Sequence, residues 1–297
     1  MNEVRAESRR AVRTKGSTAA DLGIALACLV FILVCLLPFV NLLARSLSSP
    51  MAIINRQVSF LPVEFSAAAY DRVMRDAAFS RSLLWTGGLT VVCTLLSMAI
   101  TILCAYPLTY DKLKGGKLVN GLIILTMYFS AGTIPNYILL QNLNMIDNPL
   151  ALVLPNCLSV FNFIVLRSFF FGIPESLRES AELDGANPFT VLVKIYLPLS
   201  TSVLATLALF YASGRWNGFS DALMYISNPR YAPIQLKLYQ IINNLSAIED
   251  PGNSQVQNAG EAVKAASVMF ATVPIVLIYP WLQRYFISGV TVGAVKG

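Results

Sequence analysis

Long apolar segments alternate with short polar ones along most of the chain. Segments without a charge at their centres lie at about residues 22–44, 83–107, 118–140, 149–169, 199–222 and 265–285. About 20 apolar residues span the hydrocarbon of a bilayer as a helix. A charge at the centre of such a helix costs roughly 2.5–3.5 kcal/mol, so Asp111, Asp147 and Lys264 mark boundaries between helices. The pattern predicts an all-α membrane protein with six transmembrane helices.

Composition supports this interpretation and excludes several kinds of chemistry. The chain is 56% hydrophobic and 13% charged, with a mean hydropathy of +0.62, which makes a water-soluble domain a poor alternative. All five cysteines lie inside apolar segments, without the spacing of a disulfide framework or a zinc site. Histidine, the commonest general base and metal ligand, is absent. We therefore expect no catalytic residue, no metal site and no intramembrane enzyme.

Basic residues predict the orientation in the membrane. Arg5, Arg9, Arg10, Arg13 and Lys15 lie before the first span, and the loop 111–117 carries three lysines, Lys112, Lys114 and Lys117. Short loops rich in Lys and Arg stay in the cytoplasm. We therefore expect both termini and the loop 170–198 to be cytoplasmic, with residues 1–21 as a disordered tail and 22–297 as the membrane domain. This topology explains the net charge of +6; nucleic-acid binding is a weaker alternative that lacks a basic-aromatic patch.

The loop between the fourth and fifth spans has an unusual pattern of helix signals. Pro174 followed by Glu175 favours a helix start, and Gly185 favours its end. Asn187 followed by Pro188 predicts a second helix that stops before Pro198. The product is two helices joined by a glycine bend, able to present a short helix to another protein. An ordinary amphipathic connector at the membrane surface is the alternative.

The order of residues in this loop resembles a known motif. Glu179, Ser180 and Ala181 are followed by Gly185 and, nine residues later, by Ile195-Tyr196-Leu197-Pro198. This resembles the EAA motif, E-A-A-x3-G-x9-I-x-L-P, of binding-protein-dependent ABC importer permeases, with Ser180 in place of alanine. The stretches "GRWNGFSDALMYI" and "QRYFISGVTVGAVKG" resemble the carbohydrate branch, which includes the smaller maltose-type permease and lipoprotein-linked oligosaccharide permeases.

The resemblance covers about residues 22–297 and implies the type I ABC importer permease fold. It implies a sugar or oligosaccharide importer in the bacterial cell membrane, with a second, different permease subunit, a dimer of ATPase subunits and an extracytoplasmic solute-binding protein as partners. Gly115-Gly116-Lys117 lacks the first glycine of a phosphate loop, so ATP and Mg²⁺ belong to the ATPase subunits and this chain binds no cofactor.

The resemblance also assigns candidate site residues within the loop 172–198, whose part 177–190 would be the coupling helix. Glu179 is expected to contact the ATPase, Ala181 to allow close approach, Gly185 to form the bend, and Leu197-Pro198 to end the second helix. The full set that is expected to couple the permease to the ATPase is Glu179, Ser180, Ala181, Asp184, Gly185, Ile195, Leu197 and Pro198.

The substrate path has a weaker signal. Trp216 and Asn217 combine an aromatic face with an amide, a pairing that can hold a sugar. The alternative is that Trp216 packs or lies at the interface and that Arg215 reaches the membrane surface as an anchor. The sequence leaves open which saccharide is carried and whether this subunit touches it. It also leaves open whether the two permease subunits are identical or different and which ATPase is used.

Three further alternatives complete the sequence-based picture. Residues 233–245 are predicted to form a helix that either contacts the binding protein or packs on the spans. Gly289, Gly293 and Gly297 lie in a tail that resembles the family's segment near the ATPase interface, or that frays. A secondary transporter would place acidic residues in mid-membrane, and no span has one at its centre.

Overall fold

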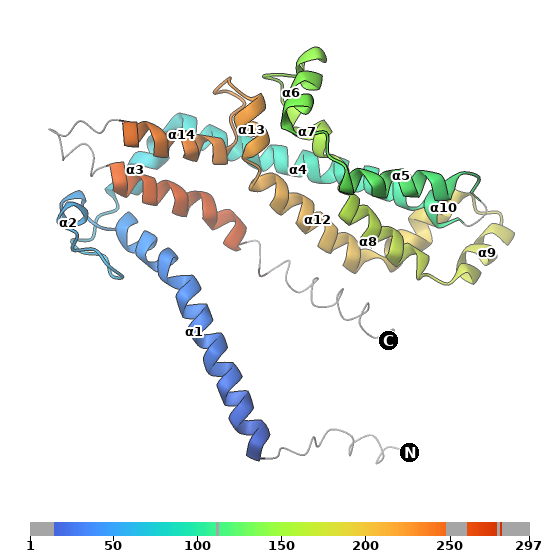
Figure 1. The fold of residues 1–297 in the computed structure, drawn as a ribbon, viewed down its shortest axis with the longest axis horizontal. Helices are drawn as coiled ribbons and strands as arrows, with labels where there is room; N and C mark the ends of the chain where they lie inside the picture. Colours follow the sequence, from blue (N-terminus) through green and yellow to red (C-terminus); the bar gives the residue numbers. More distant parts are fainter. Residues whose placement is uncertain (1–14, 111–112, 248–259, 278–279, 281–297) are drawn as a thin grey trace. The chain divides into compact units, whose positions relative to one another are not determined.

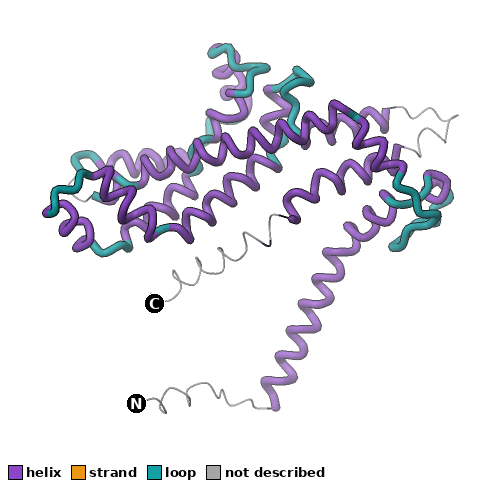
Figure 2. Tube along the Cα trace, turned by 180° about the vertical axis from the view of Figure 1, so that it is seen from behind, coloured by secondary structure: helices purple, strands orange, loops and turns teal. Residues whose placement is uncertain are grey.

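A computed structural model describes residues 15–110, 113–247, 260–277 and 280 (Figure 1). Within these residues the secondary structure is helical and no strand occurs (Figure 2), so the all-α prediction is confirmed. They divide into two compact units. The first comprises residues 15–72 and 260–269, and the second comprises residues 73–247 and 270–277. The predictions for the tail before residue 15, for Lys112 and for the three C-terminal glycines lie outside the described residues.

Three helices are long and apolar enough to cross a membrane without a break. The first, Asp21–Ser46, lies within α1 (Lys15–Ser46). The second, Ala77–Thr109, combines α4 (Ala77–Ala105) with the short helix η2 (Pro107–Thr109). The third is Gly260–Leu277, which covers the described part of the predicted sixth span.

The predicted spans 118–140 and 149–169 are each a pair of helices with a bend, so the prediction of one helix there was wrong; the predicted span 199–222 contains a helix that follows a third bend. α5 (Gly116–Tyr128) and α6 (Thr133–Asn142) meet at 115°. The segment Leu150–Asn156, formed by α7 (Leu150–Val153) and η3 (Leu154–Asn156), meets α8 (Val160–Phe171) at 46°. Pro188–Leu199 meets α12 (Thr201–Trp216) at 85°. If each pair is one span, the chain has six.

Residues at the breaks explain these bends. Gly132 adopts φ +89°, a backbone conformation that side chains disfavour, directly before α6. Ser159 is extended and its hydroxyl accepts the backbone N–H of Asn162, which starts α8 afresh. Ser200 leaves helical geometry just after Pro198, whose ring removes a backbone donor. A hydropathy pattern does not detect such breaks, because the bent and straight segments are equally apolar.

Polar contacts hold the first unit together at one end of α1. Ser48 donates its hydroxyl to the carbonyl of Ala44 and accepts the N–H of Val63. Ser49 caps α2 (Pro50–Ile54). The guanidinium of Arg45 bonds the carboxylate of Glu261 at 3.1 Å. α3 (Ala68–Arg75) follows and leads to α4.

The second unit is built on α4, α8 and α12, which lie side by side (Figures 1 and 2). α4 buries small polar residues on one face, among them Ser97 and Thr101, which permits close helix packing in a membrane. The hydroxyls of Thr101 and Tyr211 lie 2.7 Å apart, and Tyr211 also accepts the N–H of Ser159 at 3.0 Å. These bonds tie α4 and α12 to the start of α8. A core of Phe163, Leu166, Phe170 and Leu207 fills the space between the helices.

One end of the second unit is covered by α13 (Ser220–Tyr225) and α14 (Ile234–Ala247). The predicted helix 233–245 is therefore confirmed. Ile234 and Leu238 are buried, and the N–H of Ile234 donates to the hydroxyl of Thr86 on α4 at 2.8 Å. Packing on the spans thus accounts for the apolar spacing of this helix.

Candidate functional site

At the other end of the second unit the chain forms the segment that we call the elbow, residues 174–198. Its first helix is α9 (Glu175–Leu183), and Gly185 follows with φ +84°. The amide oxygen of Asn187 accepts the N–H of Thr190 and caps α10 (Pro188–Val191). The predicted order of helix, glycine bend and helix is confirmed, since each local signal acts where the sequence places it.

The end of the elbow differs from the prediction. The second helix does not stop before Pro198: it passes through a π-helical turn, η4 (Leu192–Tyr196), into α11 (Leu197–Leu199). Pro198 lies within this continuing helix, where its ring leaves one backbone hydrogen bond to the preceding turn unmade. The 85° bend to α12 follows at Ser200 instead.

The candidate coupling residues divide into an outward set and an inward set. Glu179, Ser180, Asp184, Gly185 and Pro198 are exposed. Ala181, Ile195 and Leu197 are half-buried and pack against the core of α4, α8 and α12. Small and apolar residues of the elbow therefore pack against the bundle, and Glu179 and Asp184 remain exposed.

Two exposed apolar side chains flank the glycine bend, and the sequence did not single them out as site residues. Leu183 is 89% exposed and Phe189 is 67% exposed, although both lie on ordered short helices. Large apolar side chains held in solvent beside a rigid turn are typical of a docking surface.

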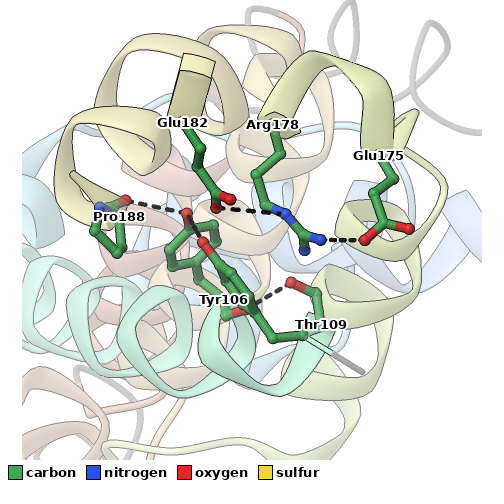
Figure 3. Close-up of polar contacts among 7 residues, drawn as sticks. Tyr106, Thr109, Glu175, Arg178, Glu182 and Pro188 are labelled. Carbon is green, nitrogen blue, oxygen red and sulfur yellow. Dashed lines mark hydrogen bonds and ion pairs between the residues drawn. The ribbon is translucent and has the colours of Figure 1, made fainter. Parts of the chain in front are cut away.

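Unlike Leu183 and Phe189, Arg178 points towards the helical bundle (Figure 3). Its side chain is only 13% exposed, and its guanidinium lies 4.4 Å from the centroid of the Tyr110 ring. It forms ion pairs with Glu175 and, at 3.6 Å, with Glu182. Burial lowers the pKa of Arg178, but the neighbouring carboxylates outweigh it and raise that pKa overall, so the side chain stays charged at any physiological pH.

Tyr106 and Tyr110 complete this contact at the end of α4. The hydroxyl of Tyr106 donates to the carbonyl of Pro188 at 3.0 Å and lies 2.6 Å from the hydroxyl of Tyr110 (Figure 3). The Tyr106 ring also meets Phe170 and Tyr196 edge to face. Sequence reasoning missed both tyrosines; their spacing of four at the end of a span, around Pro107, was the available signal.

A polar cavity of about 780 Å³ lies between α4, α8, α12 and α13. Its polar lining residues include Ser97, Asn156, Asn162, Tyr211, Asn217 and Ser220. Asn217, a predicted substrate-path residue, follows α12 directly and lines this cavity. Trp216, the other predicted residue, does not line it and is half-buried, and its indole N–H has no partner within the described part of the chain.

One ion pair lies in the wall of this cavity. Both terminal nitrogens of Arg215 bond the carboxylate of Asp221, at 2.5 and 3.1 Å, and one of them also donates to the carbonyl of Leu152. Arg215 is 7% exposed, so it is a buried partner of Asp221 and not an anchor at the membrane surface. A second cavity of about 640 Å³ borders α6 and shares Asn156, Ser220 and Asp221 with the first.

Residues 77–292 match the family described as the binding-protein-dependent transport system inner membrane component. The chain belongs to this family. It is 36% identical over 274 residues to the polygalacturonan/rhamnogalacturonan transport system permease protein YtcP of Bacillus subtilis (strain 168), covering 91% of this chain and 95% of that one. It is 38% identical over 265 residues to protein LplC of the same organism, covering 88% and 90%.

The likeness extends to a solved structure. A chain from the crystal structure of a bacterial ABC transporter involved in the import of the acidic polysaccharide alginate shares 30% identity and a TM-score of 0.85, over 92% of this permease and 98% of that chain. The resemblance inferred from the EAA motif and the type I importer fold are thus confirmed. The chain is a membrane-embedded transport subunit and not an enzyme.

The buried ion pair of the permease gives the first prediction. The substitution Asp221→Ala leaves the Arg215 guanidinium buried without its counter-ion, which destabilises a protein by about 3–5 kcal/mol. We expect a markedly lower midpoint of thermal unfolding in detergent. Asp184→Ala, which removes an exposed carboxylate on the elbow, should leave the midpoint unchanged.

The double variant Arg215→Leu/Asp221→Ala serves as the second control. Because it removes both charges, it should recover much of the stability lost in Asp221→Ala. An Asp221→Ala protein as stable as the wild type would show that the ion pair does not stabilise the fold.

Proposed function

We propose that this permease imports a carbohydrate delivered by an extracytoplasmic solute-binding protein. Import is driven by ATP hydrolysis in a dimer of partner ATPase subunits, one of which receives the elbow of this chain. A second, different permease subunit would complete the path. The observation that carries this proposal is the rigid elbow with Leu183 and Phe189 exposed beside Glu179 and Asp184. ATP and Mg²⁺ belong to the partners, and this chain binds no cofactor.

The chemistry of the elbow defines the cleft that would receive it. α9 and its cap carry four acidic residues, and their one basic residue, Arg178, turns inward to Tyr110. The outward surface therefore combines negative charge with two apolar side chains. A matching ATPase cleft has basic groups at its rim and an apolar floor. By the positive-inside rule, the elbow, Lys114, Lys117 and both termini face the cytoplasm, where ATP is available.

Transport then requires the ATPase to bias two states of the permease. When ATP closes the ATPase dimer, the docked elbows move and favour the outward-facing state. A shift in the ratio of outward-facing to inward-facing molecules from 1:99 to 99:1 needs about 5.5 kcal/mol of differential binding. ATP and the loaded binding protein can share this free energy. The elbow must move as a body for this free energy to reach the spans.

The polar cavity supports a carbohydrate as the cargo. Its volume of about 780 Å³ suits a small oligosaccharide segment, and amide and hydroxyl groups such as Asn156, Asn162 and Asn217 pair with sugar hydroxyls. Arg215 and Asp221, the charged residues in its described lining, are bonded to each other, so the cavity presents little net charge. Relatives named for transport of polygalacturonan and alginate support the class of cargo.

The direct test is uptake by the assembled complex in vesicles. With the loaded binding protein outside, we expect uptake of a labelled oligosaccharide, galacturonan or glucan, only when ATP is present inside. The variants Glu179→Lys and Gly185→Asp should remain in the membrane, lose at least about tenfold in uptake and retain less ATPase on purification, because one reverses a docking charge and the other strains a position with φ +84°.

Asp21→Lys, the same charge reversal at an exposed residue outside the elbow, is the control and should transport normally. Normal uptake by both elbow variants would contradict the coupling role. Uptake that persists without ATP and follows an ion gradient would show a secondary transporter instead.

The substrate path yields a separate prediction. Asn217→Ala should raise the KM for uptake about tenfold, as expected for the loss of a hydrogen bond worth ~1–1.5 kcal/mol, without loss of bound ATPase. Trp216→Phe should leave KM unchanged, because Trp216 lies outside the cavity lining. The reverse result, in which only Trp216→Phe raises KM, would show that the substrate path lies on the other side of α12.

A further inference from the structure

We propose that Arg178 is a positioning residue that fixes the elbow to the end of α4, so that elbow movement reaches the polar cavity through α4. This inference rests on the proposed coupling function and names the contact that transmits it. We call Arg178, Tyr110 and Tyr106 the clamp; Figure 3 labels Arg178 and Tyr106.

Arg178 holds α9 against the end of α4 through two ion pairs and a ring contact. Glu175 and Glu182 lie three and four residues from Arg178 on the same helix and pair with its guanidinium from both sides (Figure 3). These pairs orient the guanidinium, and its face then lies 4.4 Å from the centroid of the Tyr110 ring. A cation against an aromatic face is attracted most strongly where water is excluded, and here the side chain is 13% exposed.

Both helices of the elbow contact the same pair of tyrosines. α9 reaches Tyr110 through Arg178, and α10 reaches Tyr106 through the carbonyl of Pro188, 3.0 Å from the Tyr106 hydroxyl. The two tyrosine hydroxyls lie 2.6 Å apart, and their rings meet edge to face with centroids 5.4 Å apart. The glycine bend is therefore bridged on its inner side, and the two short helices cannot open independently of α4.

α4 connects the clamp to the polar cavity. This helix is unbroken from Ala77 to Ala105 and contains no proline. Cys93 and Ser97 on α4 line the polar cavity, and Thr101 bonds Tyr211 on α12 across the same wall. A packed, continuous helix between two sites is a physical element able to carry coupling between them.

The chain itself joins the elbow to the cavity at both ends of the elbow. Before the elbow lies α8, whose Asn162 lines the cavity. At its other end the elbow passes through the π-helical turn Leu192–Tyr196 and an 85° bend before α12 begins, and π-turns and sharp bends are positions where a helix yields. α4 therefore offers a straighter connection than the route through α12, and the clamp decides whether the elbow engages α4.

The test measures the number of oligosaccharide molecules imported per ATP hydrolysed by the reconstituted complex, together with the stimulation of ATPase activity by the loaded binding protein. In Arg178→Ala we expect normal amounts of bound ATPase, because the outward residues Glu179, Leu183 and Phe189 remain. The transport ratio should fall about tenfold, within the range typical of lost coupling, and the stimulation should fall with it.

Four further variants separate the clamp from a general structural role. Tyr110→Phe keeps the ring beneath the guanidinium but loses the bond to the Tyr106 hydroxyl, so its ratio should fall less than that of Tyr110→Leu, which should match Arg178→Ala. Arg178→Lys keeps the charge without the planar group and should give an intermediate ratio. Arg178→Ala/Tyr110→Leu should be no worse than either single variant, since both remove one contact. Lys194→Ala removes an exposed charge near the clamp and is the control.

The outcomes distinguish this inference from the proposed function. If the wild type imports with ATP but Arg178→Ala and Tyr110→Leu keep its ratio, or if their effects add, the clamp is wrong and the proposed function stands. If transport falls only in proportion to lost ATPase subunits, Arg178 is structural and the inference is also overturned. If the wild type shows no ATP-dependent uptake, the proposed function fails; stimulation of ATPase activity that is equal in wild type and Arg178→Ala would then overturn the clamp separately.

Discussion

The seating of the Arg178 guanidinium on the tyrosine pair at the end of α4 is the contact on which the rest of the molecule's working depends. Most of the chain is apolar helix, and in lipid the hydrophobic effect supplies no driving force that holds one such helix to the next. A directional contact is needed wherever force must pass from one helix to the next. Arg178 provides it because two neighbouring carboxylates hold its charge in place and Tyr110 covers it from water.

In the wall of the cavity, as at the elbow, opposite charges are paired. Arg215 and Asp221 are placed together, so the bundle gains two polar groups at the cavity wall without an uncompensated buried charge. Hydroxyl and amide groups supply the remaining polarity. Two of the ion-paired groups of the second unit thus lie at the elbow and at the cavity, and the continuous helix α4 runs from the first to the wall of the second.

Local signals explain why the elbow could be predicted from the sequence. Pro174, Gly185 and Asn187 each act on their own neighbours, and the structure places helix start, bend and cap at these residues. The breaks inside three spans were missed, since hydropathy measures transfer into lipid and not helix continuity. The tyrosines were missed because the contact of Tyr106 with Pro188 joins residues 82 positions apart, which no local pattern encodes. Trp216 and Asn217 are adjacent in sequence, yet only Asn217 lines the cavity, because side chains on successive helical residues point in different directions.

The central claim is that the elbow and α4 move as one body, and an intramolecular distance tests it most directly. Spin labels at Ser176 on α9 and Leu95 on α4, both exposed, can be introduced after the five cysteines are replaced. The distance between them is then measured in the assembled complex with and without trapped ATP. We predict the same distance distribution in both states, while transport-dependent distances elsewhere change. A shift of the Ser176–Leu95 distance between the two states would show that the elbow moves independently of α4 and would contradict the account.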